Sequence, residues 1–337
     1  MEEYRQYRAT IPPVPEGTPR PLWSVMIPTY NCAKYLRETL ESVLVQDPGP
    51  EFMQIEVVDD CSTKDDPLSV VTEIGGGRIS FYRQPRNVGH TANFNTCLQR
   101  SRGELVHLLH GDDSVREGFY RNMCRPFDVH RELGAAFCRD IRMDESGRWL
   151  SVSPPLQSKS GMLDNWLEMI ALGQRLQAPA MVVRRTAYER LNGFDRRLFF
   201  YGEDWEMWVR IAAHYPVWYV MEPLAVYRIR DTSLSGQSLR TGQNGYDYRK
   251  AIEINQAYFP PIRASEISQK ARENFALACL RRAHRLFKAG EQKAAFAQLR
   301  EAIRSRWSLR VFVSLVFLCV VWFVNVIGLA RFISRRD

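Results

Sequence analysis

Two adjacent aspartates, Asp112 and Asp113, follow the apolar run 104–109 and a short His-Gly step. Like charges in neighbouring positions repel each other, so a nearby cation would stabilise the pair. Mg²⁺ and Mn²⁺ take one or two protein carboxylates and leave their other positions to phosphate oxygens. The pair therefore indicates a divalent metal on a diphosphate, or alternatively an N-cap for a helix suggested by residues 114–123.

A second acidic pair, Asp59 and Asp60, ends another strand-like run at residues 54–58. An ionised carboxylate accepts hydrogen bonds and donates none, which suits the ring N–H of uracil, thymine or guanine. Adenine and cytosine present an acceptor at the corresponding ring nitrogen and fit poorly. The pattern is thus compatible with a nucleotide-base pocket, and equally with a solvated strand end followed by a turn.

A third acidic site, Glu203 and Asp204, stands between Gly202 and a tryptophan-rich stretch. An acid at the start of a helix usually interacts with the helix dipole. Here Trp205 and Trp208 would place apolar surface around the carboxylates, and desolvation raises carboxylate basicity. A more basic carboxylate is what a general base requires near neutral pH.

Alternating segments must position these acids. Strand-like runs cover residues 23–31, 54–60, 78–84 and 104–110, and the first of them is expected to stop at Pro28. Helical spacing appears between them at 33–46 and 90–101. This alternation predicts an α/β fold with a mostly parallel, Rossmann-like sheet and helices on both faces. Ligands bind beyond the carboxyl ends of such strands, so both aspartate pairs should line one crevice.

The chain divides into four expected regions. They are a proline-rich lead-in (1–22), a catalytic domain (23–240), a helical extension with a hairpin (241–306) and a hydrophobic helix with basic flanks (307–337). Residues 311–330 are twenty positions without a charge, about 30 Å of helix, the thickness of a bilayer's hydrocarbon core. They predict a membrane-associated helix, with a surface helix or a buried soluble helix as alternatives.

Charge and cysteine content bear on location. Residues 300–337 carry seven arginines and two acidic residues, so the basic charge concentrates beside the apolar segment and favours a membrane surface over nucleic acid. The N-terminus has no apolar signal segment, and the seven cysteines contain no CxxC pair. We therefore expect free thiols, a membrane-associated protein and a cytoplasmic catalytic domain.

Taken together, six stretches closely resemble the family 2 glycosyltransferases, which have the GT-A fold. In order, they are SVMIPTYN, VVDDCSTKD, RNVGHTANFN, RGELVHLLHGDD, GFDRRLFFYGEDWEMWVRIA and EPLAVYRIRDTSLS. The resemblance covers roughly residues 22 to 236. It implies inverting transfer of a sugar from a nucleoside diphosphate donor.

The resemblance also implies roles for individual residues. The nucleotide would be held by Pro28, Tyr30, Asp59, Asp60 and Asn87, and Mn²⁺ or Mg²⁺ by Asp112 and Asp113. The general base would be Asp204. The diphosphate or sugar would be contacted by His110, Glu203, Arg228 and Arg230, and the acceptor side would be formed by Trp205 and Trp208. Two positions depart from the family pattern: His110 replaces the first aspartate of an Asp-x-Asp-Asp motif, and Arg230 stands where a histidine is frequent. The metal would then rely on Asp112, Asp113 or both, or accept a nitrogen ligand from His110. Arg228 or Arg230 could hold the diphosphate oxygens directly, which weakens the expectation of strong metal dependence.

The resulting expectation is an enzyme of cell-envelope polysaccharide synthesis. It would transfer a sugar from a UDP-, dTDP- or GDP-sugar to a hydroxyl of a glycan or lipid-linked saccharide, without a nucleic-acid partner. One alternative is a polyprenyl-phosphate glycosyltransferase, although an ionised phosphate acceptor needs no general base. Another is a catalytically silent nucleotide-sugar-binding membrane scaffold, which would have no need of Asp204.

Overall fold

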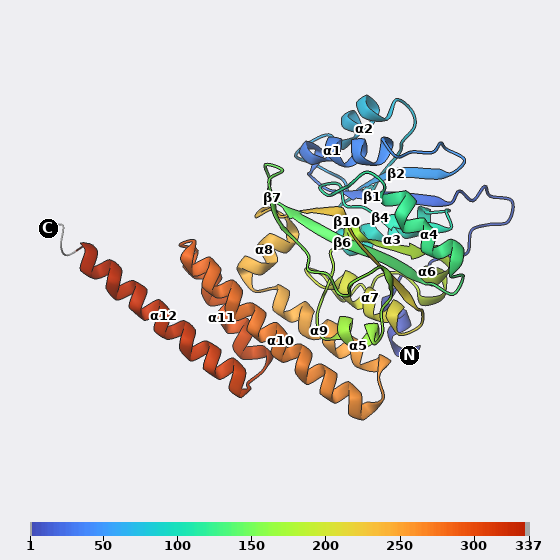
Figure 1. Ribbon diagram of the computed structural model, residues 1–337. Helices are drawn as coiled ribbons and strands as arrows, with labels where there is room; N and C mark the ends of the chain where they lie inside the picture. The colour runs from blue at the N-terminus through green and yellow to red at the C-terminus, as the bar shows by residue number, and fades with distance from the viewer. Residues whose placement is uncertain (1, 334–337) are drawn as a thin grey trace. The chain divides into compact units, whose positions relative to one another are not determined.

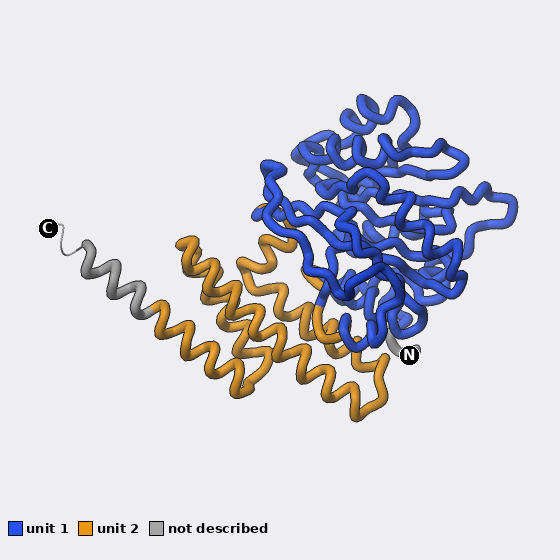
Figure 2. Tube along the Cα trace, in the orientation of Figure 1, with its two compact units in different colours: residues 1–170, 174–199, 203–231 blue, residues 171–173, 200–202, 232–337 orange. Residues whose placement is uncertain are grey.

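The computed structural model describes the backbone of residues 2–333 and the side chains of residues 5–322. The chain forms two compact units, drawn in Figure 2. Unit 1 comprises residues 1–170, 174–199 and 203–231, and unit 2 comprises residues 171–173, 200–202 and 232–337.

Unit 1 is built on one sheet with the path β3-β2-β1-β4-β9-β6-β10-β5, to which β7 and β8 add at the sides. The strands are β1 (Trp23–Thr29), β2 (Met53–Asp59), β3 (Ser80–Arg83), β4 (Leu105–Leu108), β5 (Ser114–Val115), β6 (Ala135–Met143), β7 (Trp149–Val152), β8 (Gly161–Met162), β9 (Met181–Arg184) and β10 (Val217–Arg228). β1 and β2 are buried along their whole length, including the polar Gln54 and Glu56 of β2, as expected for strands of a sheet covered on both faces.

The sheet is mixed, not mostly parallel. β3, β2, β1 and β4 are parallel to one another, and β6 is parallel to β10. β9 separates these two parallel groups and runs antiparallel to both β4 and β6. An apolar strand such as β9 reads the same in either direction, so hydrophobic pattern alone does not reveal this reversal.

β1 also continues past Pro28, where the sequence suggested that it would stop. Pro28 pairs with Val58 of β2, and its carbonyl accepts the N–H of Gly111 at 3.0 Å. The strand tolerates the proline because Pro28 lies one residue from the end of β1. Its carbonyl still accepts a hydrogen bond there, although it has no N–H to donate.

Helices cover unit 1 between its strands (Figure 1). They are α1 (Ala33–Leu44), α2 (Pro67–Gly75), α3 (His90–Arg100), α4 (Phe119–Val129), α5 (Trp166–Ala171), α6 (Arg185–Leu191) and α7 (Glu203–Ala212). α4 begins only at Phe119 after an N-cap at Gly118. Asp112 and Asp113 therefore do not cap it, which removes the N-cap alternative for that pair.

Unit 2 is helical. Its helices are α8 (Leu234–Thr241), α9 (Asn244–Asn255), α10 (Pro261–Lys288), α11 (Gln292–Ser305) and α12 (Leu309–Ile333). α10 and α11 form the expected hairpin, turning at Gly290 with φ +80° and burying Ala283, Ala295 and Ala302. Phe287 of α10 stacks on Trp322 of α12 with ring centroids 4.2 Å apart.

The C-terminal apolar segment lies on α12. Within the part of the chain that the structure describes, no helix is both long enough and apolar enough to cross a membrane. The expected anchor extends to residue 337, and its side chains after Trp322 lie outside the described residues.

Candidate active site

The two aspartate pairs lie on either side of one strand end. β1 is flanked by β2 and β4, all three are parallel, and their carboxyl ends meet at one edge. The N–H of Asp60 donates to the carbonyl of Thr29 at 2.9 Å, and the N–H of Gly111 donates to Pro28. The structure therefore brings the pairs together around the end of β1, as the strand alternation indicated.

Asp59 is committed to contacts within the protein. It is fully buried and accepts hydrogen bonds from the N–H and hydroxyl of Ser62, the hydroxyl at 2.5 Å. The guanidinium of Arg83 adds an ion pair at 2.7 Å. Asp59 therefore braces the turn after β2, a turn in which Cys61 adopts a positive φ of 59°.

Asp60 faces the loop before α3. Its two oxygens accept the N–H groups of Val88 at 2.7 Å and Gly89 at 3.0 Å. Burial raises the pKa of Asp60, and the two amides oppose that shift. Each oxygen keeps a further lone pair that could accept the N–H of a base. Nearby, Tyr30 is 44% exposed and Asn87 is exposed, so both can meet a ligand.

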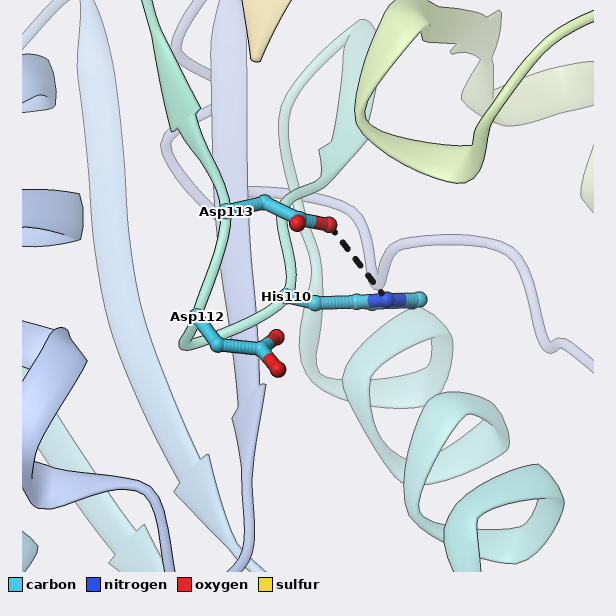
Figure 3. Close-up of side chains that lie close together, drawn as sticks. All are labelled: His110, Asp112 and Asp113. Carbon is cyan, nitrogen blue, oxygen red and sulfur yellow. Dashed lines mark ion pairs between the residues drawn. The ribbon is translucent and has the colours of Figure 1, made fainter. Parts of the chain in front are cut away.

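His110, Asp112 and Asp113 form a possible metal-binding group. One ligand atom from each residue lies within 4.8 Å of the others, and Figure 3 shows the His110 and Asp113 side chains facing each other. Asp113 is 1% exposed, and its Oδ2 lies 3.7 Å from Nδ1 of His110 without a hydrogen-bond partner. Burial and the charge of Asp112 raise the pKa of Asp113, whereas burial lowers the pKa of His110 and keeps its nitrogens available.

This donor set fits a divalent ion. Two carboxylates suit Mg²⁺ or Mn²⁺, and a neutral imidazole nitrogen is a ligand that Mn²⁺ accepts more readily than Mg²⁺. A buried carboxylate oxygen without a hydrogen-bond donor is costly, and a cation would remove that cost. His110, which was expected to contact the diphosphate or the sugar, thus belongs to the same group as the two aspartates.

The two arginines after β10 take different places. Arg230 approaches Asp112 with Nη2 2.5 Å and Nε 2.7 Å from the same carboxylate oxygen. Arg228 donates through its backbone N–H to Asp113 at 2.9 Å and through Nε to the carbonyl of Asp112 at 3.0 Å. The Arg228 guanidinium also pairs with Glu38. Arg228 thus braces the acidic loop, and Arg230 lies beside the expected diphosphate position.

Asp204 is placed at the start of α7 in a buried setting. Its oxygens accept the N–H of Trp205 at 2.7 Å and the amide of Gln174 at 2.6 Å. Burial and the charge of Glu203 raise the pKa of Asp204 to about 7. Half of such a carboxylate is ionised at neutral pH, as a general base requires. Gln174, from the loop after α5, gave no signal in the sequence.

Glu203 is held by a histidine from another element. Oε1 of Glu203 lies 3.5 Å from Nε2 of His90, at the start of α3. Burial alone would raise the pKa of Glu203, but the charge and hydrogen bond of His90 outweigh it, and the pKa is lowered. The adjacent Thr91 hydroxyl donates to the carbonyl of Leu198 at 2.9 Å. This short segment therefore links Asp60, through Val88 and Gly89, to Glu203.

The tryptophans of α7 are not where the sequence suggested. Trp205 and Trp208 are 0% and 2% exposed, and Nε1 of Trp205 donates to the carbonyl of Ile170 at 2.6 Å. An acceptor cannot stack on rings buried to this extent. They instead desolvate the start of α7, which accords with the raised pKa of Asp204.

α7 is also fixed by the N-terminal segment. Glu206 pairs with Arg210 at 2.6 Å and with Arg8 at 3.1 Å, and Nε of Arg8 lies 3.9 Å from Asp195. A β-bridge joins Arg8 to Asp195 in the backbone as well. The sequence reading treated residues 1–22 as a lead-in, whereas Arg8 bridges the two ends of the loop that leads into Glu203.

Comparisons with known proteins identify the family. The family model described as Glycosyl transferase family 2 matches residues 24–191. The uncharacterized protein MT1568 of Mycobacterium tuberculosis is 28% identical over 244 residues, covering 69% of this chain and 75% of the relative. An uncharacterized glycosyltransferase of Methanocaldococcus jannaschii, MJ1057, is 28% identical over 221 residues, covering 64% and 74%.

Solved structures show the same fold. TarS residues 1–349 from S. aureus, in complex with UDP-GlcNAc, has a TM-score of 0.59 at 16% identity, covering 84% of this chain and 91% of that one. The mannosyltransferase PcManGT from Pyrobaculum calidifontis, in complex with GDP-Man and Mn²⁺, has a TM-score of 0.54 at 19% identity, covering 95% and 86%. The chain therefore belongs to glycosyl transferase family 2 and is a nucleotide-sugar-dependent glycosyltransferase with the GT-A fold.

Proposed function

We propose that this enzyme transfers a sugar, with inversion, from a nucleoside diphosphate donor to a hydroxyl of a glycan or lipid-linked saccharide. The observation that carries the proposal is Asp204, a partly buried carboxylate whose pKa is raised to about 7 beside the ionised Glu203. A hydroxyl must lose its proton as it attacks, and a base with a pKa near neutrality assists that step most.

On the donor side, Asp60 is proposed to accept the ring N–H of the base, with Tyr30 and Asn87 at the exposed edge. Uracil, thymine and guanine all present that N–H, so UDP-, dTDP- and GDP-sugars remain candidates. Structural neighbours were solved with UDP-GlcNAc and with GDP-Man, which supports a donor from the UDP- or GDP-sugars.

Asp112 and Asp113 would hold Mn²⁺ or Mg²⁺, with His110 as a third ligand. When bound, the ion would neutralise the diphosphate leaving group. Arg230, 2.5 Å from Asp112, would add positive charge on the same side. The negative charge of the leaving diphosphate would therefore develop beside two positive charges, the ion and Arg230, that are in place before the reaction.

The chemical step follows from these placements. Asp204 takes the acceptor proton while the acceptor oxygen bonds to the anomeric carbon and the bond to the diphosphate breaks. Attack opposite the leaving group inverts that carbon, through an oxocarbenium-like transition state of the kind known from glycoside hydrolysis. His90 keeps Glu203 ionised, and the Glu203 charge maintains the basicity of Asp204.

Two relatives suggest the acceptor class. One matching region, 33% identical over 111 residues, belongs to the poly(ribitol-phosphate) beta-N-acetylglucosaminyltransferase TarS of Staphylococcus aureus, of which it covers 19%. Another belongs to the minor teichoic acid biosynthesis protein GgaB of Bacillus subtilis. A hydroxyl of a cell-envelope polymer is therefore the proposed acceptor. A polyprenyl phosphate is the weaker candidate, because its ionised oxygen would not need Asp204.

We further propose that the protein is membrane-associated through residues 307–337, with its catalytic domain in the cytoplasm. The described part of α12 exposes Phe312, Val313, Phe317 and Val320, and Arg310 at its start is also exposed. Apolar side chains beside arginines suit an anionic lipid surface. Truncation after residue 308 should release the protein from membranes and keep donor hydrolysis. Recovery of the full chain in the soluble fraction without detergent would contradict this proposal.

The catalytic proposal is tested by donor turnover. Purified full-length protein would be screened with UDP-, dTDP- and GDP-sugars by thermal shift, with Mn²⁺ and with EDTA. A ligand at 100 times its Kd should stabilise the protein by about 2.7 kcal/mol. The stabilising donors are then assayed for hydrolysis and transfer. Binding without turnover for every donor would favour the silent scaffold, and no binding at all would remove the donor assignment.

A further inference from the structure

Tyr35 of α1 lies beside both arginines that follow the acidic loop in the site. Cζ of Arg228 is 4.8 Å from the centroid of the Tyr35 ring, and Cζ of Arg230 is 5.1 Å from it. At such distances a guanidinium is attracted to the face of an aromatic ring. All three residues belong to unit 1. One ring of unit 1 therefore stands next to two cations of the donor site.

The Tyr35 ring is itself held in place. Tyr35 is 8% exposed, and its hydroxyl donates to Oε2 of Glu145 at 3.2 Å. α1 is also tied to the acidic loop, because the hydroxyl of Thr39 donates to the carbonyl of Asp113 at 2.7 Å. The ring thus keeps a fixed position relative to the carboxylate of Asp112.

The two arginines depend on this ring to different extents. Arg228 is anchored by its contacts with the acidic loop and by its ion pair with Glu38. Arg230 approaches the carboxylate of Asp112, which is also a proposed metal ligand. A carboxylate that turns to a metal holds a guanidinium less firmly. The contact with the Tyr35 ring does not involve Asp112, so it would remain.

A guanidinium that is oriented before the donor arrives binds the donor more tightly. An arginine side chain has many rotamers, and a ligand that immobilises it removes that freedom. Packing on a ring restricts the rotamers of Arg230 in advance, so less freedom is lost when a diphosphate binds.

We propose that Tyr35 is a positioning residue of the donor site, and that its ring holds the guanidinium of Arg230 in the orientation that receives the diphosphate. The inference rests on the proposed function, in which Arg230 lies beside the diphosphate. It adds to that function a residue that acts through Arg230.

The first measurement needs no ligand. Urea denaturation of the full chain compares Tyr35→Leu, which removes the ring, with Arg230→Gln and with the double variant. The double variant should lose less stability than the sum of the two single losses, because both changes remove the same contact. Tyr82→Leu is the matched control, since the ring of Tyr82 lies 4.1 Å from Cζ of Arg100 elsewhere in unit 1. Its loss should add fully to that of Arg230→Gln, and additive losses for Tyr35→Leu would overturn the inference.

The second measurement is the affinity for UDP and for uridine, determined by calorimetry in EDTA. Uridine lacks the diphosphate, so only UDP binding should respond to the position of Arg230. Tyr35→Leu should bind UDP about 3- to 30-fold more weakly than wild type, the range of a cation–π contact, and should bind uridine as wild type does. Tyr35→Phe keeps the ring and loses only the hydroxyl, so it should keep the wild-type affinity for UDP, as should Tyr82→Leu.

The third comparison places Tyr35→Leu in the Arg230→Gln background. There it should weaken UDP binding by less than about twofold, because the guanidinium on which the ring acts is gone. An undiminished loss in that background would overturn the inference, and so would equal weakening of UDP and uridine or a loss in Tyr35→Phe as large as in Tyr35→Leu. Should Tyr35→Leu fail to fold, Tyr35→Met, which also lacks the ring, is judged by the same outcomes. If wild type binds neither UDP nor GDP, the donor assignment of the proposed function fails, while the denaturation measurement still decides whether Tyr35 holds Arg230.

Discussion

The carboxylate of Asp112 lies 2.5 Å from the guanidinium of Arg230. One oxygen of the acidic loop is therefore paired with a cation of the protein itself. If a metal binds Asp112 and Asp113 as proposed, Arg230 and the ion would both place positive charge beside the diphosphate. This relationship explains how the enzyme could use a motif whose first acidic position is His110.

Replacing Arg230 by glutamine should make nucleotide binding more dependent on metal. In EDTA the variant should bind UDP about 10- to 100-fold more weakly than wild type, because one charge-assisted contact is lost. With saturating Mn²⁺ the loss should be smaller, since the ion supplies the missing charge. Calorimetric titration under both conditions measures this, with the exposed Arg148→Gln as control. Equal losses in EDTA and Mn²⁺ would show that Arg230 does not substitute for the metal.

His90 should act on the reaction through Glu203. Replacing it by glutamine removes the positive charge 3.5 Å from Glu203, so the pKa of Glu203 should rise. If Glu203 carries less negative charge, it raises the pKa of Asp204 by a smaller amount. The pH below which the transfer rate falls should therefore shift to a lower value. The catalytic rate should fall, because a less basic carboxylate is a weaker base.

The measurement for His90→Gln is the rate at saturating donor across pH 5–9, beside UDP affinity. His130→Gln, which changes a histidine paired with Glu132 on the surface, is the control. If the rate of His90→Gln falls at the same pH as the wild-type rate, His90 has only a structural role.

Arg8 should contribute to stability far beyond what its place in the sequence suggests. Its side chain is 7% exposed and pairs with Glu206, which is fully buried. Arg8→Met removes one charged partner of Glu206 and leaves another, Arg210, so it should lower the free energy of unfolding by about 2 kcal/mol, as for the loss of a buried charged hydrogen bond. Urea denaturation measures this, with the exposed Arg5→Met as control. A loss as small as that of Arg5→Met would contradict the role.

The elements that carry the donor site could be predicted because their signals are local. The strand before Asp59, the strand before Asp112 and the helix after Gly202 each show their own periodicity. Once β1, β2 and β4 are parallel neighbours, their ends must meet, and the aspartate pairs follow. The same reasoning could not give the antiparallel β9, because its direction depends on the connection before it.

The contacts that tune the site could not be predicted because they join distant residues. His90 meets Glu203, Gln174 meets Asp204 and Arg8 meets Glu206, and no local pattern marks these pairings. The burial of the tryptophans of α7 could not be predicted from the sequence either. Their residue type indicated apolar surface, but only packing decides that Trp205 and Trp208 turn inward.

Transfer should lose its rate as pH falls below about 7. The pKa of Asp204 is raised to about 7, so the carboxylate is ionised above that value and protonated below it. A general base works only when ionised, so the rate at saturating donor should fall about tenfold for each pH unit below the pKa. A rate that stays constant down to pH 5 would remove Asp204 as the titrating base.

The Asp204→Asn variant separates catalysis from structure. Asparagine keeps the shape of aspartate and can still accept the N–H of Trp205, and the amide of Gln174 can turn to meet the new NH₂ group. The fold and UDP affinity should therefore remain, and the melting temperature should be equal or higher, because a buried charge is removed. Transfer should fall by about 10²–10⁴-fold, or about 3 to 5 kcal/mol in barrier height. A role for Asp204 only as an acidic partner of the α7 dipole is worth about 1 kcal/mol of stability and would not affect the rate. Initial rates at saturating donor, measured beside melting curves, distinguish the two roles. A variant that keeps more than about a tenth of wild-type turnover, less than about 1.4 kcal/mol of barrier, would exclude Asp204 from the chemical step.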